Sequence, residues 1–150
     1  MPDAAIPIED ITAAVAVLHA GDRAGGRERL MALWARGPSP TTRCILAHYI
    51  ADAQDSVAEE LAWDRAALAA ADAVTVAEET DIMPGVTVAA FYPSLWLNLS
   101  DAALRAGDLA EARRAHESGA ATLALLPNDP YGVTVRNAFS RLAERLDAAG

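Results

Sequence analysis

The sequence predicts an all-α protein, and three observations support this. About a quarter of the 150 residues are alanine and only 5% are aromatic, and alanine has the highest helix propensity of any residue. Apolar residues recur at helical spacing in segments that glycine and proline interrupt. The tripeptide Ala-Gly-Asp separates two such segments at 20–22 and again at 106–108. We therefore expect one domain of helical hairpins around a core of small side chains.

A first pair of helices is expected at about 7–36. Its first helix is marked by apolar residues at helical spacing, namely Ile8, Ile11, Ala14, Val15 and Leu18. Gly21 supplies the positive φ that ends a helix, and Asp22 can cap the next one. Gly25 and Gly26 weaken that second helix by roughly 1 kcal/mol each relative to alanine.

A second pair is expected at about 40–73. Ser39 can cap its first helix, and Pro40 suits the first helical position, where a backbone N–H is not needed. A break follows at Ala-Gln-Asp, residues 53–55, where a third copy of the turn would fall with Gln54 in place of glycine. Asp55 or Ser56 is the cap expected for the next helix, which Ser56 and Glu59 can start as a capping box.

A long loop is expected at 74–92, with a helical turn near 77–79. Its β-branched residues and the Pro84-Gly85 pair argue against a continuous helix. The part from 82 to 92 is unusually apolar for a loop, through Ile82, Met83, Val86, Val88, Phe91 and Tyr92. It is therefore expected either to fold back onto the helices or to dock on a second chain.

A third pair is expected at about 93–126, opened by Pro93 and turned at Gly107, with Asp108 and Glu111 as a capping box. The sequence Asn-Asp-Pro, residues 128–130, then starts a last helix at 130–148. Its expected inward face consists of Val133, Phe139, Leu142 and Leu146. Its expected solvent face consists of Arg136, Arg141, Arg145 and Asp147.

These turns and small residues resemble the tetratricopeptide repeat (TPR) family, whose helix pairs recur at about 34 residues. In the third pair the matching positions are Trp96, Leu99, Ser100, Ala103, Gly107, Ala112, His116 and Pro127. Of these, Pro127 comes three residues later than in the family pattern. The first pair matches at Ala14, Gly21, Leu30 and Pro38, and the second only at Leu46, Ala47 and Ile50. The resemblance implies a TPR-like right-handed α-solenoid of about three helix pairs plus a C-terminal capping helix. A generic alanine-rich helical bundle is the alternative.

The resemblance also implies a function, because the first helices of TPR pairs line a concave groove. In this chain the groove positions would include Ile11, Val15, His19, His48, Asp52, Asn98, Asp101 and Arg105. We expect a non-catalytic protein–protein interaction module that binds a peptide or protein segment there. No cofactor is expected.

The net charge of -9 lies entirely in the middle of the chain. Residues 52–101 carry ten acids and one arginine, Arg65, whereas acids and arginines balance elsewhere. This field repels phosphate backbones and anionic lipids, so we expect no nucleic-acid or membrane partner and a protein or peptide partner that is basic. The single cysteine, the N-terminus without a signal-peptide pattern and the lack of a long apolar run favour a cytoplasmic protein.

Two other functions stay open. Cys44, His48 and Asp52 recur at i, i+4 and i+8 and could serve a metal-dependent enzyme. Three ligands on one straight helix span about 12 Å, however, so we expect no metal site and no enzyme. The third alternative is a homo-oligomeric scaffold, for example a homodimer, held together by the apolar segment 82–92.

Overall fold

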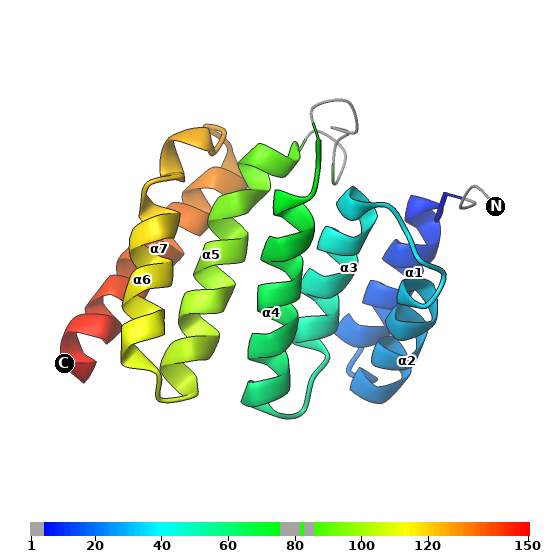
Figure 1. Cartoon of the computed structure of the whole chain (residues 1–150), viewed down its shortest axis with the longest axis horizontal. Coiled ribbons are helices and arrows are strands. Elements are labelled where there is room, and N and C mark those ends of the chain that lie inside the picture. Colours follow the sequence, from blue (N-terminus) through cyan, green and yellow to red (C-terminus); the bar gives the residue numbers. More distant parts are fainter. Residues whose placement is uncertain (1–4, 76–81, 83–85) are drawn as a thin grey trace. The chain divides into compact units, whose positions relative to one another are not determined.

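The computed structural model describes residues 5–75, 82 and 86–150. Within these residues it contains seven α-helices, one short 3-10 helix and no β-strand, which confirms the all-α class (Figure 1). Within them, too, no helix is both long and apolar enough to cross a membrane. The chain divides into two compact units, which we call the N-terminal unit (Met1–Glu79) and the C-terminal unit (Thr80–Gly150).

The N-terminal unit begins with the hairpin of α1 (Ile8–His19) and α2 (Arg23–Trp34). Gly21 between them has a φ of 99°, and the Asp22 side chain accepts a hydrogen bond from the Gly25 N–H at 2.8 Å. The predicted turn chemistry is therefore confirmed. Gly26 has a second role, because a Cβ there would lie 2.8 Å from the Leu18 Cβ. The glycine that weakens α2 is also what allows α1 to approach it closely.

The second hairpin joins α3 (Pro40–Asp52) to α4 (Val57–Asp72) through a different turn. Within the described residues no residue other than glycine has a positive φ, so Gln54 does not reproduce the glycine turn. Ser56, not Asp55, caps α4 by accepting from the Glu59 N–H at 3.1 Å. Asp55 instead pairs with two arginines of α2, Arg27 at 3.0 Å and Arg23 at 3.5 Å.

Helix α3 supplies more buried residues than any other helix of the N-terminal unit. Seven of its thirteen residues are buried: Thr41, Cys44, Ile45, Leu46, Ala47, Ile50 and Ala51. At the edge of the core, Trp34 of α2 and Trp63 of α4 meet edge to face with ring centroids 5.0 Å apart. The Arg43 guanidinium lies 4.5 Å from the Trp34 ring centroid, a cation–π contact.

The C-terminal unit begins with α5 (Val88–Arg105), five residues before the expected start at Pro93. That expectation, and with it the upper end of the expected 74–92 loop, was wrong because Pro93 lies inside the helix. Thr87 is the cap, since its hydroxyl accepts from the Ala90 N–H at 3.1 Å. A proline one turn into a helix removes one backbone hydrogen bond, and the complete burial of Pro93 offsets that cost. The expected turn near 77–79 lies outside the described residues.

Helices α5 and α6 (Leu109–Ala120) form the third hairpin. Its turn repeats the first one, with Gly107 at a φ of 86° and the Asp108 side chain accepting from the Glu111 N–H at 2.9 Å. The Ser100 side chain is fully buried, and its hydroxyl donates to the Ala112 carbonyl oxygen at 2.7 Å. This bond fixes the register of α5 against α6.

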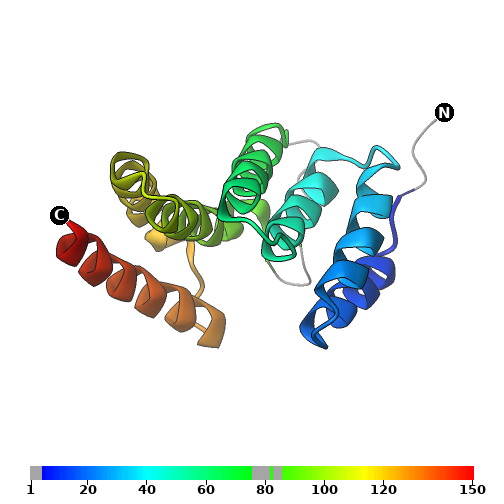
Figure 2. The same cartoon turned by 90° about the horizontal axis from the view of Figure 1, so that it is seen from below.

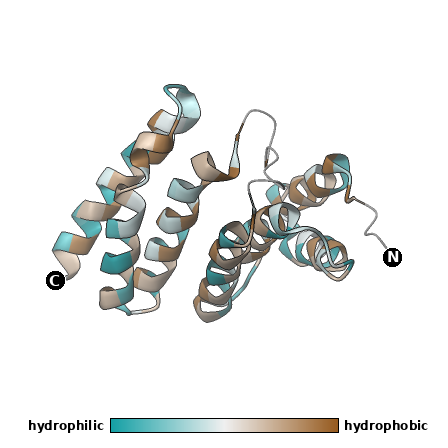
Figure 3. Cartoon of the chain, turned by 45° about the horizontal axis from the view of Figure 1, so that its top comes forward, coloured by the Kyte–Doolittle hydropathy of each residue, from teal (hydrophilic) through white to brown (hydrophobic). Residues whose placement is uncertain are grey.

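Helix α7 (Pro130–Ala149) follows the 3-10 helix η2 (Leu123–Leu125) and contacts both α5 and α6 (Figure 2). Apolar and hydrophilic residues alternate along it (Figure 3), as one buried face requires. That face contains the predicted Phe139, Leu142 and Leu146, together with Val135. Val133 was wrongly expected there, since it is 53% exposed. A helix has 3.6 residues per turn, so residues four and seven positions apart share a face. Val135 has this spacing from Phe139 and Leu142, whereas Val133 does not.

The contact between α6 and α7 depends on Gly119. A Cβ at this position would lie 2.6 Å from both the Phe139 Cζ and the Trp96 Cβ. We predict that Gly119→Ala destabilises the protein by about 1–3 kcal/mol, because overpacking outweighs the helix propensity that alanine adds. Urea denaturation measures the change, and Ser118→Ala at the exposed neighbouring position is the control. Equal or greater stability of Gly119→Ala would contradict this packing.

Candidate functional site

A groove of about 290 Å³ lies between α5 and α7 in the C-terminal unit. Its lining residues are Leu97, Asn98, Asp101, Ala138, Arg141, Leu142 and Arg145. Asn98 and Asp101 are two of the three α5 residues that the sequence assigned to a binding groove. The leucines and the alanine provide an apolar floor, and the other four residues provide polar groups.

Asp101 connects the two walls of this groove. Its carboxylate accepts from the Arg145 Nη1 of α7 at 2.6 Å and from the Arg105 Nε, one turn along α5, at 2.9 Å. The Asp101 side chain is 33% exposed, and both arginine side chains are more exposed than that. Arg105, the third predicted α5 residue, thus contributes by holding Asp101. The negative charge expected to meet a partner is already balanced.

The groove carries an excess of positive charge. Two arginines, Arg141 and Arg145, and one acid, Asp101, line it, which leaves one positive charge at neutral pH. Arg141 is exposed and forms no ion pair with any residue that the structure describes. A groove of this charge attracts carboxylate groups, although the chain as a whole is acidic.

The predicted residues of α1 differ in how much surface they offer. Ile11 is only 3% exposed and belongs to the core. Val15 is half-buried, and His19 is exposed as the last residue of the helix. Ile11 therefore has almost no surface with which to hold a partner.

The predicted residues of α3 are also unlike one another. Asp52 is exposed at the end of the helix, whereas His48 is half-buried with its ring edge to face with Tyr49 at 5.1 Å. Burial lowers the pKa of His48 from 6.5 to about 4. His48 is consequently neutral at pH 7.

Cys44, the third member of the stripe considered for an enzyme, is a buried thiol. Burial, and secondarily the negative charge of Asp72, raises the pKa of Cys44 to about 12. A thiol with that pKa is protonated at neutral pH and is a poor nucleophile. Across the parts of the chain that can be described, no three His, Cys, Asp or Glu residues are placed to hold one metal ion.

The described residues of the apolar segment 82–92 are largely covered within the chain. Ile82, Val88 and Phe91 are 2–4% exposed, and Val86 and Tyr92 are half-buried. Met83 lies outside the described residues. The described residues of this segment therefore leave little apolar surface for docking on a second chain.

The wall of the groove that α7 provides was not predicted from the sequence. Ala138, Arg141, Leu142 and Arg145 stand at i, i+3, i+4 and i+7 and so share one helical face. The spacing is visible in the sequence, but it predicts only that Arg141 and Arg145 face solvent. Nothing in the sequence said that this face of α7 would lie opposite Asn98 and Asp101.

The paired arginines of Asp101 lead to a prediction for stability. Asp101→Asn removes the negative charge and should destabilise the protein by about 0.5–1.5 kcal/mol at low salt, because each exposed ion pair contributes up to ~1 kcal/mol. The loss should shrink in 1 M NaCl, where the charges are screened. Urea denaturation measures both values, with Asp147→Asn on the exposed side of α7 as the control. Equal effects of the two variants would rule out the proposed role of the pairs.

The lowered pKa of His48 leads to a prediction for pH dependence. Because the unfolded chain binds a proton near pH 6.5 and the folded chain only near pH 4, the stability attributable to neutral His48 is complete above pH 6.5. It is lost as the pH falls toward 4, by about 2 kcal/mol between pH 7 and pH 5. Thermal or urea denaturation of the protein and of His48→Gln at both pH values isolates this contribution. His48→Gln should lose less stability between pH 7 and pH 5 than the unmodified protein does. An identical loss in both proteins would show that His48 does not cause it.

Comparison with known proteins gives no further guide to this groove. No family model, no curated protein and no solved structure matches the chain. The function must therefore be inferred from the residues of the chain and from the geometry of the groove.

Proposed function

We propose that this chain is a TPR-like, non-catalytic protein–protein interaction module, and that it holds a peptide or protein segment in the groove between α5 and α7. The observation that carries the proposal is the composition of that groove. An apolar floor is enclosed by polar side chains from two helices, and Asn98 and Asp101 occupy positions that the family resemblance assigns to binding.

The floor and the polar groups have different physical tasks. Leu97 and Ala138, which are half-buried above the buried Leu142, give a partner side chain an apolar surface on which to become desolvated, and such contact supplies most of the affinity at a small interface. The arginines and Asn98 orient the segment and set its charge. A volume of about 290 Å³ suits one or two side chains rather than a large ligand.

The charge of the groove favours an acidic segment. Arg145 pairs with Asp101, so the one surplus positive charge is that of Arg141, beside the apolar floor. The basic partner expected from the sequence would instead require the acids of the N-terminal unit, where eight of the ten acids between 52 and 101 are found. A segment with a carboxylate next to a bulky apolar residue is the partner proposed for the groove.

A binding role fits the chemistry of the groove better than catalysis does. Its side chains are amides, guanidinium groups, alkyl groups and one carboxylate. That carboxylate is already paired with two arginines, Arg105 and Arg145. Such groups position a ligand but supply neither a nucleophile nor a proton shuttle.

Selection of peptides from a random phage-displayed library on the full chain tests the proposal. We predict enrichment of peptides with an acidic residue within one or two positions of a large apolar residue. Arg141→Glu should lower the affinity for the selected peptide at least tenfold, because it replaces attraction by repulsion. The variant leaves the buried Leu142 unchanged, so the fold should stay intact. The affinity should also fall with salt. Isothermal titration calorimetry measures both effects.

Arg114→Glu on the exposed surface of α6 is the matched control, since it makes the same change of charge away from the groove. Its peptide affinity should stay within about twofold of the unmodified protein. Equal losses for the two variants would mean that only the overall charge of the protein matters. Selection of basic peptides would contradict the proposed partner.

A further inference from the structure

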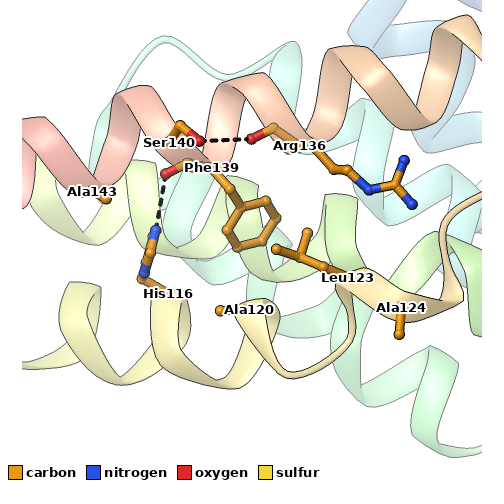
Figure 4. Close-up of a pocket in the computed structure, with 8 residues that line it drawn as sticks. All are labelled: His116, Ala120, Leu123, Ala124, Arg136, Phe139, Ser140 and Ala143. Carbon is orange, nitrogen blue, oxygen red and sulfur yellow. Dashed lines mark hydrogen bonds between the residues drawn. The ribbon is translucent and has the colours of Figure 1, made fainter.

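A second hollow, of about 430 Å³, lies in the C-terminal unit between α6, η2 and α7 (Figure 4). It shares no lining residue with the groove between α5 and α7. From α7 it takes Arg136, Phe139, Ser140 and Ala143, which lie on the other side of that helix from Ala138, Arg141 and Arg145. Ligand pockets of about 300–1,000 Å³ accommodate small molecules.

The middle of this hollow is apolar. Phe139 and Leu123 lie side by side there, with Ala120 and Ala124 along the wall formed by α6 and η2 (Figure 4). The two alanines are exposed and Leu123 is only half-buried, so this apolar surface is not covered by the chain itself. The hollow therefore offers an apolar body a place to leave water.

Arg136 supplies one positive charge at one end. Its guanidinium donates to the Leu126 carbonyl oxygen at 3.1 Å and to the Pro127 carbonyl oxygen at 3.4 Å. These bonds hold the side chain in place but do not neutralise it, and no acidic residue lines the hollow. Arg136 forms no ion pair within the described part of the chain. A fixed guanidinium with remaining N–H donors suits a carboxylate.

His116 and Ser140 lie at the other end of the hollow, with Phe139 between them and the Arg136 guanidinium (Figure 4). The His116 Nε2 is 3.0 Å from the Phe139 carbonyl oxygen. A carbonyl oxygen only accepts, so Nε2 carries the proton and Nδ1 is the nitrogen that remains for a ligand. The His116 imidazole and the Arg136 guanidinium lie at opposite ends of the hollow. A single anionic group can therefore contact Arg136 but not both side chains at once.

We propose that this hollow binds a small organic monocarboxylate with an apolar body. The carboxylate lies on Arg136, and the apolar body extends along Leu123 and Phe139 toward His116. An exposed ion pair alone contributes little affinity, so binding needs the apolar contact as well. A dianionic phosphate would need more than the single cation present at that end. The inference does not depend on the peptide groove, because the two sites use different residues.

Titration of octanoate into the full chain, followed by calorimetry and by amide chemical shifts, tests the proposal. We expect octanoate to bind at least tenfold more tightly than acetate, which lacks the apolar body, and than octylamine, which has the opposite charge. The shifted amides should belong to the end of α6, η2 and the middle of α7. Failure of octanoate to bind, equal binding of octylamine, or shifts confined to other elements would overturn the proposal.

Two variants test the two halves of the site separately. Arg136→Gln should weaken octanoate at least tenfold, whereas Arg114→Gln on the exposed surface of α6 should change it less than twofold. Ala120→Trp keeps every charge and fills the apolar middle, so it should also weaken octanoate at least tenfold. If Arg136→Gln impairs folding because the bonds to Leu126 and Pro127 are lost, Ala120→Trp still tests whether octanoate binds in this hollow. Octanoate affinity unchanged in Ala120→Trp would place the ligand elsewhere.

Discussion

The close approach of Phe139 to Gly119 determines how the C-terminal unit is built. There is no space for a Cβ at Gly119, since it would clash with both Phe139 and Trp96. The ring of Phe139 can therefore reach into the α5–α6 hairpin and join the buried cluster with Leu126 and Val135. Helix α7 is held against both helices of that hairpin as a result, and each of its flanks faces a different neighbour.

Both proposed sites follow from this placement of one helix. The flank of α7 that contains Ala138 and Arg141 faces α5 and completes the groove between these two helices. The flank that contains Arg136 and Ser140 faces α6 and η2 and completes the second hollow. Here the same helix also brings arginines to two surfaces of a chain whose net charge is strongly negative.

The charge in the groove between α5 and α7 depends on which side chains lie next to one another and not on the composition of the chain. Asp101 belongs to the most acidic stretch of the sequence, yet it lies between Arg105 and Arg145. One of these arginines is a helical neighbour at i+4, and the other comes from 44 residues further along the chain. A sum over residues 52–101 gives the sign of the whole field but not the sign at this groove. Electrostatic preference for a partner is set within about a Debye length, roughly 10 Å at 0.1 M salt.

The sequence by itself determined the helices and their turns, because these depend on nearby residues. The glycines at 21 and 107 and the caps Asp22, Ser39, Ser56 and Asp108 all act within four positions of where they stand. Pro93 was misjudged because a proline fits the first turn of a helix and also a buried position further in, and only the packing of α5 distinguishes them. Tertiary structure alone decided that α7 lies opposite Asn98 and Asp101 and that Ile11 is in the core. Such contacts join residues far apart in the chain, where helical periodicity gives the face of each helix but not its neighbour.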